Sequence, residues 1–104
     1  MTKAAFWCRE GTIRGFTLEG HCGGVHGTDI VCAAVSSAAY LTANTVTDAY
    51  GCTAEIAEHD GHLSMKLSPE ESLLCQPILV GFYRHMEQLA EQYPRQITLE
   101  MTEV

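Results

Sequence analysis

Two residues close together in the sequence carry the side chains that thiol-based nucleophilic chemistry needs. His21 ends a strand-like run, and Cys32 falls in the first turn of a helix that we expect to begin at Asp29. A cysteine has an ordinary pKa of about 8.5, and a helix N-terminus or a nearby imidazolium lowers it, which favours the reactive thiolate. An imidazole can take the thiol proton and later pass it to a leaving amine. The pair can meet only if the segment between them folds back.

A glycine-rich loop joins the histidine to the cysteine. Glycine adopts backbone conformations that other residues rarely reach, so this composition predicts conformational freedom. We expect the loop to cover the site and to become ordered when a peptide binds, although the glycines are also explained by tight turns alone. They are Gly23, Gly24 and Gly27.

Asp29 and Ser36 are supporting candidates. Asp29 is placed to cap the helix by accepting from an N–H of its first turn, and the alternative is that it orients His21. Ser36 lies one turn after Cys32 and faces the same side of the helix, where it would position a substrate group or simply fill the helix. Cys32 also has a structural reading, because cysteine is often a small buried hydrophobe. If it is catalytic, N–H groups at the helix start would stabilise the oxyanion.

The segment around this pair resembles a known signature. Residues 29–36 read DIVCAAVS, and Gly20-His21 stands at the end of the preceding run. This pattern resembles the bacterial ribosomal-processing cysteine protease family, Prp. The resemblance implies that His21 and Cys32 are a catalytic dyad in a homodimeric enzyme. It also implies that the substrate is the precursor of the large-subunit ribosomal protein L-twenty-seven, whose N-terminal extension is cut off after an aromatic residue.

Two non-proteolytic functions stay open at this point. Cys22 stands where the family usually has alanine, and Gly24 where it often has tyrosine. In a thiol redox sensor Cys22 would resolve an oxidised Cys32, which requires their Cα atoms to lie within about 7 Å, and Cys22→Ala would abolish the function. In a non-enzymatic dimeric scaffold for ribosome assembly the cysteine and histidine would be structural, and Cys32 would alkylate no faster than the other cysteines.

Composition sets further limits. A length of 104 residues fits a single cysteine protease domain over residues 1–104, which can bury one core without a metal or disulfides. The net charge of −7 argues against a nucleic-acid surface and fits a basic partner. We expect no apolar run long enough to span a membrane and no signal peptide, and therefore a cytoplasmic protein. The five cysteines show no CxxC spacing, so we predict neither metal nor cofactor.

Hydrophobic periodicity predicts the order β-β-α-β-β-α-β. This is an α+β domain with a mixed, mainly antiparallel sheet of about five strands and two helices. An out-of-phase Ile13 predicts a bulge near Gly15, and Ser68 with Glu71 predicts a capping box. Pro77 is expected to kink the second helix. The expected elements are strands at 3–9, 12–18, 53–59, 62–67 and 95–102, and helices at 29–49 and 69–93.

Overall fold

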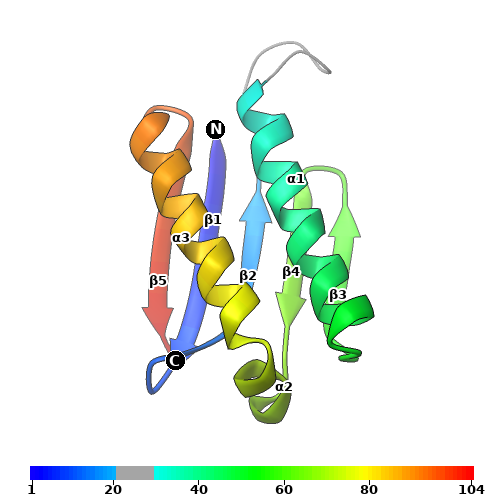
Figure 1. Cartoon of the computed structure of the whole chain (residues 1–104). Helices are drawn as coiled ribbons and strands as arrows, with labels where there is room; N and C mark the ends of the chain where they lie inside the picture. Colours follow the sequence, from blue (N-terminus) through cyan, green and yellow to red (C-terminus); the bar gives the residue numbers. More distant parts are fainter. Residues whose placement is uncertain (21–29) are drawn as a thin grey trace.

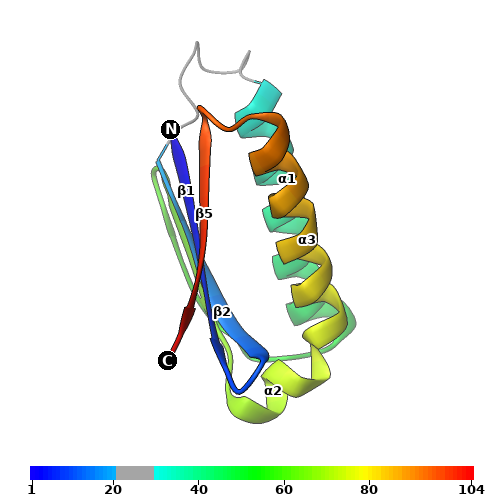
Figure 2. The same ribbon diagram turned by 90° about the vertical axis from the view of Figure 1, so that its left-hand side faces the viewer.

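The computed structural model describes residues 1–20 and 30–104 of the chain. A five-stranded sheet in the order β3-β4-β2-β1-β5 is covered on one face by helices, and its other face is left open (Figures 1 and 2). Among the described strands, only β1 and β5 run parallel, so the predicted mixed, mainly antiparallel sheet of an α+β domain is confirmed. The strands are Thr2–Arg9 (β1), Thr12–Glu19 (β2), Glu55–His59 (β3), His62–Lys66 (β4) and Ile97–Glu103 (β5). The helices are Ile30–Asn44 (α1), Thr45–Ala49 (η1), Pro69–Leu74 (α2) and Gln76–Gln92 (α3).

Two hairpins build four of the five strands. The β1–β2 turn holds Glu10 at φ 52° and Gly11 at φ 79°, and the β3–β4 turn holds Gly61 at φ 70° after Asp60. Both turns fall in the gaps between the predicted strands, at 10–11 and 60–61, and the positive φ values of Gly11 and Gly61 are those that glycine adopts readily. The strands β2 and β4 pair antiparallel in the centre, so each hairpin leaves one strand nearer the edge.

A bulge in β2 explains the change of phase in its sequence. Trp7 pairs with Gly15 and Cys8 pairs with Ile13, which leaves Arg14 as the extra residue. The extra residue turns Ile13 to the same buried face as Phe16 and Leu18. A Cβ on Gly15 would collide with the Trp7 ring, so glycine is required here. The bulge predicted near Gly15 is therefore confirmed.

The side chain of Gln76, at the start of α3, binds the bulged strand. Its Nε2 donates to the carbonyl of Ile13 over 2.8 Å, and its Oε1 accepts from the N–H of the same residue over 3.1 Å. Because the amide replaces both hydrogen bonds that a neighbouring strand would make, it satisfies the backbone beside the irregularity. This contact fixes α3 relative to β2.

The second predicted helix is two helices. The capping box of Ser68 and Glu71 is present at the start of α2, as predicted. The chain then breaks at Cys75, and Pro77 lies in the first turn of α3, where its missing N–H costs nothing. In one continuous helix Leu74 would share a face with Ile78 and Phe82, but it is 53% exposed, because the break turns it outward.

The first helix runs as predicted to Ala49, with its last turn a π-helix that ends before Gly51 at φ 72°. By length and composition the stretch Ile30–Ala49 could cross a membrane, with a mean hydropathy of 1.3, contrary to our expectation that no segment is long enough. Length and composition are weak evidence for a membrane span, because the core helices of soluble proteins can share them. Here the stretch packs on the sheet, and its buried residues are Val31, Val35, Ala39, Thr42, Ala43 and Val46.

Candidate active site

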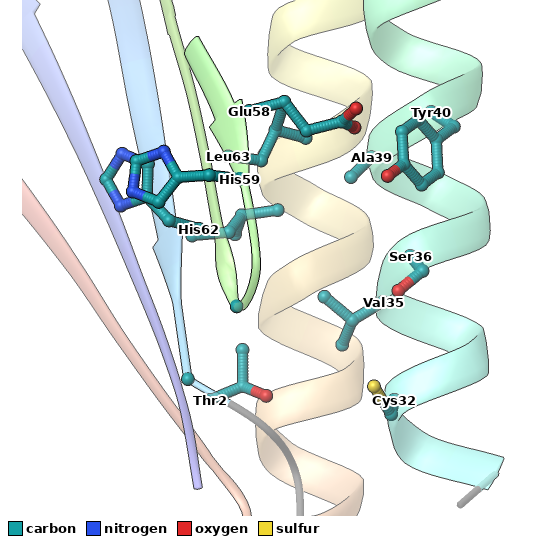
Figure 3. Close-up of a pocket in the computed structure, with 13 residues that line it drawn as sticks. Thr2, Cys32, Val35, Ser36, Ala39, Tyr40, Glu58, His59, His62 and Leu63 are labelled. Atoms are coloured by element: carbon teal, nitrogen blue, oxygen red, sulfur yellow. The ribbon is translucent and has the colours of Figure 1, made fainter. Parts of the chain in front are cut away.

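A pocket of about 250 Å³ lies between the first half of α1 and the sheet (Figure 3). It forms because α1 buries small residues, which leave space above the strands. The lining comes from the start of β1, the end of β2, the face of α1 and the β3–β4 hairpin. The residues are Thr2, Leu18, Gly20, Cys32, Val35, Ser36, Ala39, Tyr40, Glu58, His59, Gly61, His62 and Leu63.

One face of α1 supplies a row of functional side chains. Cys32, Ser36 and Tyr40 follow one another at four-residue steps, so they lie above one another on the helix. Cys32 and Ser36 are half-buried, and Tyr40 is 49% exposed. In Figure 3 the sulfur of Cys32 lies at one end of this row and the Tyr40 ring at the other. The two described candidates from the sequence therefore share one pocket.

The end of β2 reaches the same pocket. Gly20 lines it with φ 88°, and its N–H donates to the carbonyl of Gly61 over 2.8 Å. A Cβ on Gly20 would collide with the carbonyl of Met1, so only glycine fits. His21 is the next residue in the sequence. The end of β2 therefore forms part of the wall of the Cys32 pocket, and the next residue in the sequence is the predicted base.

The other predicted site residues lie outside the described part of the chain. These are His21, Asp29, Gly23, Gly24 and Gly27, together with the second thiol at Cys22. Their roles, and the distance between the two members of the dyad, stay predictions. Among the described residues, no group of three or more histidine, cysteine or acidic side chains could hold a metal ion.

At the far end of the pocket, Tyr40 on α1 faces Glu58 on β3. The interaction of its hydroxyl with the Glu58 carboxylate raises the pKa of Tyr40. Figure 3 shows the Glu58 side chain directed toward the tyrosine. On the opposite side of the hairpin from Glu58, His59 and His62 stack with ring centroids 4.6 Å apart. The His62 Nδ1 lies 3.4 Å from a carboxylate oxygen of Glu19.

Three other cysteines described by the structure are held in states unsuited to nucleophilic attack. The Sγ atoms of Cys52 and Cys75 lie 3.4 Å apart in the core, and burial raises the pKa of Cys75 to about 12. Cys8 donates from its Sγ to a carboxylate oxygen of Glu103 over 3.1 Å, which raises the pKa of the Cys8 thiol. A raised pKa lowers the thiolate fraction at neutral pH, so the thiols of Cys8 and Cys75 should react slowly.

The fold and the cysteine-bearing pocket are those of a small thiol peptidase. The family model described as cysteine protease Prp matches residues 1–98, so the chain belongs to the Prp family and is a cysteine protease. A crystal structure of SMU.848 from Streptococcus mutans is 30% identical and has a TM-score of 0.84, covering 100% of this chain and 96% of that one.

Two structures of the ribosomal processing protease Prp from S. aureus share the fold. The complex with a covalently linked product peptide has 23% identity and a TM-score of 0.91. The complex with a substrate peptide has 22% identity and a TM-score of 0.86. Both alignments cover 98% of this chain and 100% of the other. No curated protein sequence matches the chain.

Sequence reasoning missed the wall formed by the β3–β4 hairpin. Among the aromatic residues Phe6, Trp7, Phe16 and Tyr40, only Tyr40 lines the pocket. Phe6 and Phe16 are core residues. The alternation in β3 could have placed Glu58 on the helix-facing side with Ile56. Nothing in the linear sequence, however, shows that a distant helix residue would face it.

Proposed function

We propose that the protein is a cysteine endopeptidase that uses a dyad of Cys32 and His21 to remove the N-terminal extension of the ribosomal protein L-twenty-seven. One observation carries the proposal. Cys32 stands in the first turn of α1 and lines a pocket whose opposite wall, Gly20, directly precedes His21. Family membership and the peptides bound in the S. aureus Prp structures support peptide hydrolysis in this pocket.

The first half of the reaction is acylation. His21 takes the proton of the Cys32 thiol, and the sulfur attacks the scissile carbonyl to form a tetrahedral intermediate. The positive end of the α1 dipole stabilises both the thiolate and the oxyanion, because both carry negative charge at the helix N-terminus. The intermediate collapses as the C–N bond breaks. His21 passes the proton to the departing amine, which leaves a thioester on Cys32.

The second half releases the extension. His21 takes a proton from water, the hydroxide attacks the thioester carbonyl, and the C–S bond breaks to return the thiol and a carboxylic acid. Ser36, one turn below Cys32 in the same pocket, is placed to position the substrate. Asp29 would cap the helix or orient His21, and the loop of Gly23, Gly24 and Gly27 would cover the bound peptide.

The surroundings fit such a substrate. The net charge of −7 attracts a basic ribosomal protein. The apolar surface of Leu18, Val35, Ala39 and Leu63 offers contact to an aromatic residue near the cut. We further propose a single protease domain over residues 1–104, a homodimer and a cytoplasmic location, as the family resemblance implies, without a metal or cofactor.

The test is cleavage of a peptide that carries the N-terminal extension of L-twenty-seven from the same organism. Wild type should cut at one site, and Cys32→Ala and His21→Ala should both be inactive while circular dichroism shows them folded. Cys75→Ser is the matched control, because it changes a thiol outside the pocket. An uncut peptide, or an active Cys32→Ala variant, would refute the proposed function.

The redox and scaffold alternatives predict different results. A redox sensor should lose its function in Cys22→Ala, whereas the protease should keep cleaving. A scaffold should have a Cys32 that alkylates no faster than Cys8 or Cys75, whose thiolate fractions are held low by their raised pKa values. Fast and selective alkylation of Cys32 would exclude the scaffold, and cleavage by Cys22→Ala would exclude the redox sensor.

A further inference from the structure

The end of the pocket opposite Cys32 carries a negative charge. Glu58 of β3 pairs with Leu63 of β4, so the two side chains point to the same face of the sheet. Ile56 lies on this face too, which is the one that lines the pocket. Glu58 carries the only carboxylate among the described residues that line the pocket, and none of these residues is lysine or arginine. No ion pair of the described residues involves Glu58, although Glu100 lies 3.7 Å from the Nζ of Lys3 and Glu87 lies 3.6 Å from Arg84.

The Tyr40 hydroxyl faces this carboxylate and interacts with it, which raises the pKa of Tyr40. Figure 3 shows the Glu58 side chain directed from β3 toward Tyr40 on α1. A carboxylate accepts at about four lone-pair sites, so one tyrosine hydroxyl leaves capacity for a second donor. Bonds from an ammonium or guanidinium group to a carboxylate are stronger than neutral ones.

The distance from Cys32 sets which substrate residue can reach Glu58. Tyr40 lies about two helical turns beyond Cys32, which is roughly 12 Å at 1.5 Å per residue. An extended peptide rises about 3.3 Å per residue, so this span corresponds to between three and four residues. A peptide whose scissile carbonyl is at Cys32 and which follows α1 therefore brings its third or fourth residue from the cut to Glu58.

We propose that Glu58, oriented by Tyr40, is a specificity residue that selects lysine or arginine at the third or fourth position from the scissile bond. This inference rests on the proposed function, because it takes Cys32 as the reacting atom. Glu58 acts in binding and takes no part in bond cleavage. Its effect should therefore appear as a lower KM for basic peptides, with kcat unchanged.

The experiment is a lysine scan of an otherwise neutral cleavable peptide, with one lysine at each of four positions on either side of the cut. For wild type, kcat/KM should rise about fivefold over the alanine peptide at the third or fourth position on one side, as expected for a partly exposed ion pair. The side of the cut that responds identifies the arm of the substrate that follows α1. The preference should shrink in high salt.

Variants assign the preference to Glu58. In Glu58→Gln the lysine-to-alanine ratio should fall to about one, and in Glu58→Lys it should invert in favour of a glutamate-bearing peptide. Tyr40→Phe, which frees the carboxylate, should reduce the ratio. Glu55→Gln is the matched control, because Glu55 is on the same strand but on the opposite face of the sheet, outside this pocket.

The failure of this inference differs from the failure of the proposed function. If wild type cuts the peptides and Cys32→Ala does not, but the lysine preference is absent or equal in wild type and Glu58→Gln, the specificity role of Glu58 is overturned and the dyad stands. If Glu55→Gln loses the preference as much as Glu58→Gln, the effect is general charge attraction and the inference is also overturned. If wild type cuts none of the peptides, the proposed function itself fails.

Discussion

The two long helices cover the same sheet, but the pocket that holds Cys32 lies under α1, whereas α3 packs large side chains against the strands. The buried face of α3 carries Leu79, Phe82 and Met86, and Phe82 packs against Phe6 and Phe16 with ring centroids 5.4 Å and 5.0 Å apart. The buried face of α1 carries valine, alanine and threonine. Figure 2 shows both helices as one layer on the sheet, so the pocket follows from the size of the side chains beneath α1.

This contrast separates two tasks within one domain. The half under α3 supplies the close-packed core, where large apolar groups stabilise the fold. The half under α1 is less closely packed, because its buried side chains are small, and the remaining space lies beside a cysteine at a helix N-terminus. Mutations in the two halves should therefore affect different quantities, stability in one and substrate binding in the other.

The largest effect is expected from Phe82→Ala. Removing this buried ring, 3% exposed, should lower the free energy of unfolding by about 3–5 kcal/mol. The measurement is urea unfolding followed by circular dichroism. Activity per folded molecule should stay near wild type below the unfolding transition, because the ring lies outside the pocket. A folded but inactive variant would contradict the separation of tasks.

Gln76→Ala should come next. It removes the amide that satisfies the N–H and the carbonyl of Ile13, which should cost about 1–3 kcal/mol in unfolding free energy. The matched control is Gln88→Ala, an exposed position on the same helix, where a change within about 0.5 kcal/mol is expected. Equal effects of the two substitutions in urea unfolding would show that the contact to the bulge adds nothing.

Ala39→Leu should affect the other half. Ala39 lines the pocket, so a leucine would fill it and raise KM at least tenfold, or about 1.4 kcal/mol in binding. Ala38→Leu is the matched control, because Ala38 lines a separate furrow between α1 and α3. Steady-state kinetics with the cleavable peptide compare the two. An unchanged KM in Ala39→Leu would show that the substrate does not use this pocket.

The smallest effect is expected at the joint between the halves, where Glu71 of α2 binds Thr53. The N–H of Thr53 donates to the carboxylate over 2.8 Å, and Ser68 adds further bonds, which lowers the pKa of Glu71 below its usual value. A lowered pKa stabilises the fold above the unfolded pKa of about 4.3, and this stability is lost as the pH falls through the folded pKa.

The corresponding measurement is unfolding by urea across that acidic range. The stability difference between wild type and Glu71→Gln should be full at neutral pH and should shrink as the pH falls. Glu70→Gln on the same turn is the control, because it leaves the bonds from Thr53 in place. A difference that does not change with pH would show that the Glu71 charge contributes nothing.

The sequence predicted the elements better than the surfaces between them. Local signals sufficed for the β turns, the capping box of Ser68 and Glu71, and the bulge near Gly15, because each depends on neighbouring residues. The break at Cys75 was missed because Pro77 is compatible with both a kinked helix and a new helix start. Core packing decides between them, through the burial of Cys75 and Leu79.

The candidate site was predictable only in part for the same reason. Helical spacing placed Cys32 and Ser36 on the same side of one helix, and both line the same pocket. The contact of Tyr40 with Glu58 depends on the tertiary arrangement of α1 and β3, to which no local pattern in the sequence points. Residues that meet across two elements, with no motif joining them, need the structure.

The most direct test of the account is covalent labelling with a peptide chloromethyl ketone that ends in phenylalanine, followed by mass spectrometry of the digested protein. The reagent alkylates a nucleophile that acts on a carbonyl after an aromatic residue. The account predicts a single adduct on Cys32, which disappears when competing substrate is added and is strongly reduced in His21→Ala. An adduct on Cys22 or Cys8 in place of Cys32, or labelling of Cys32 that neither substrate nor His21→Ala affects, would contradict it.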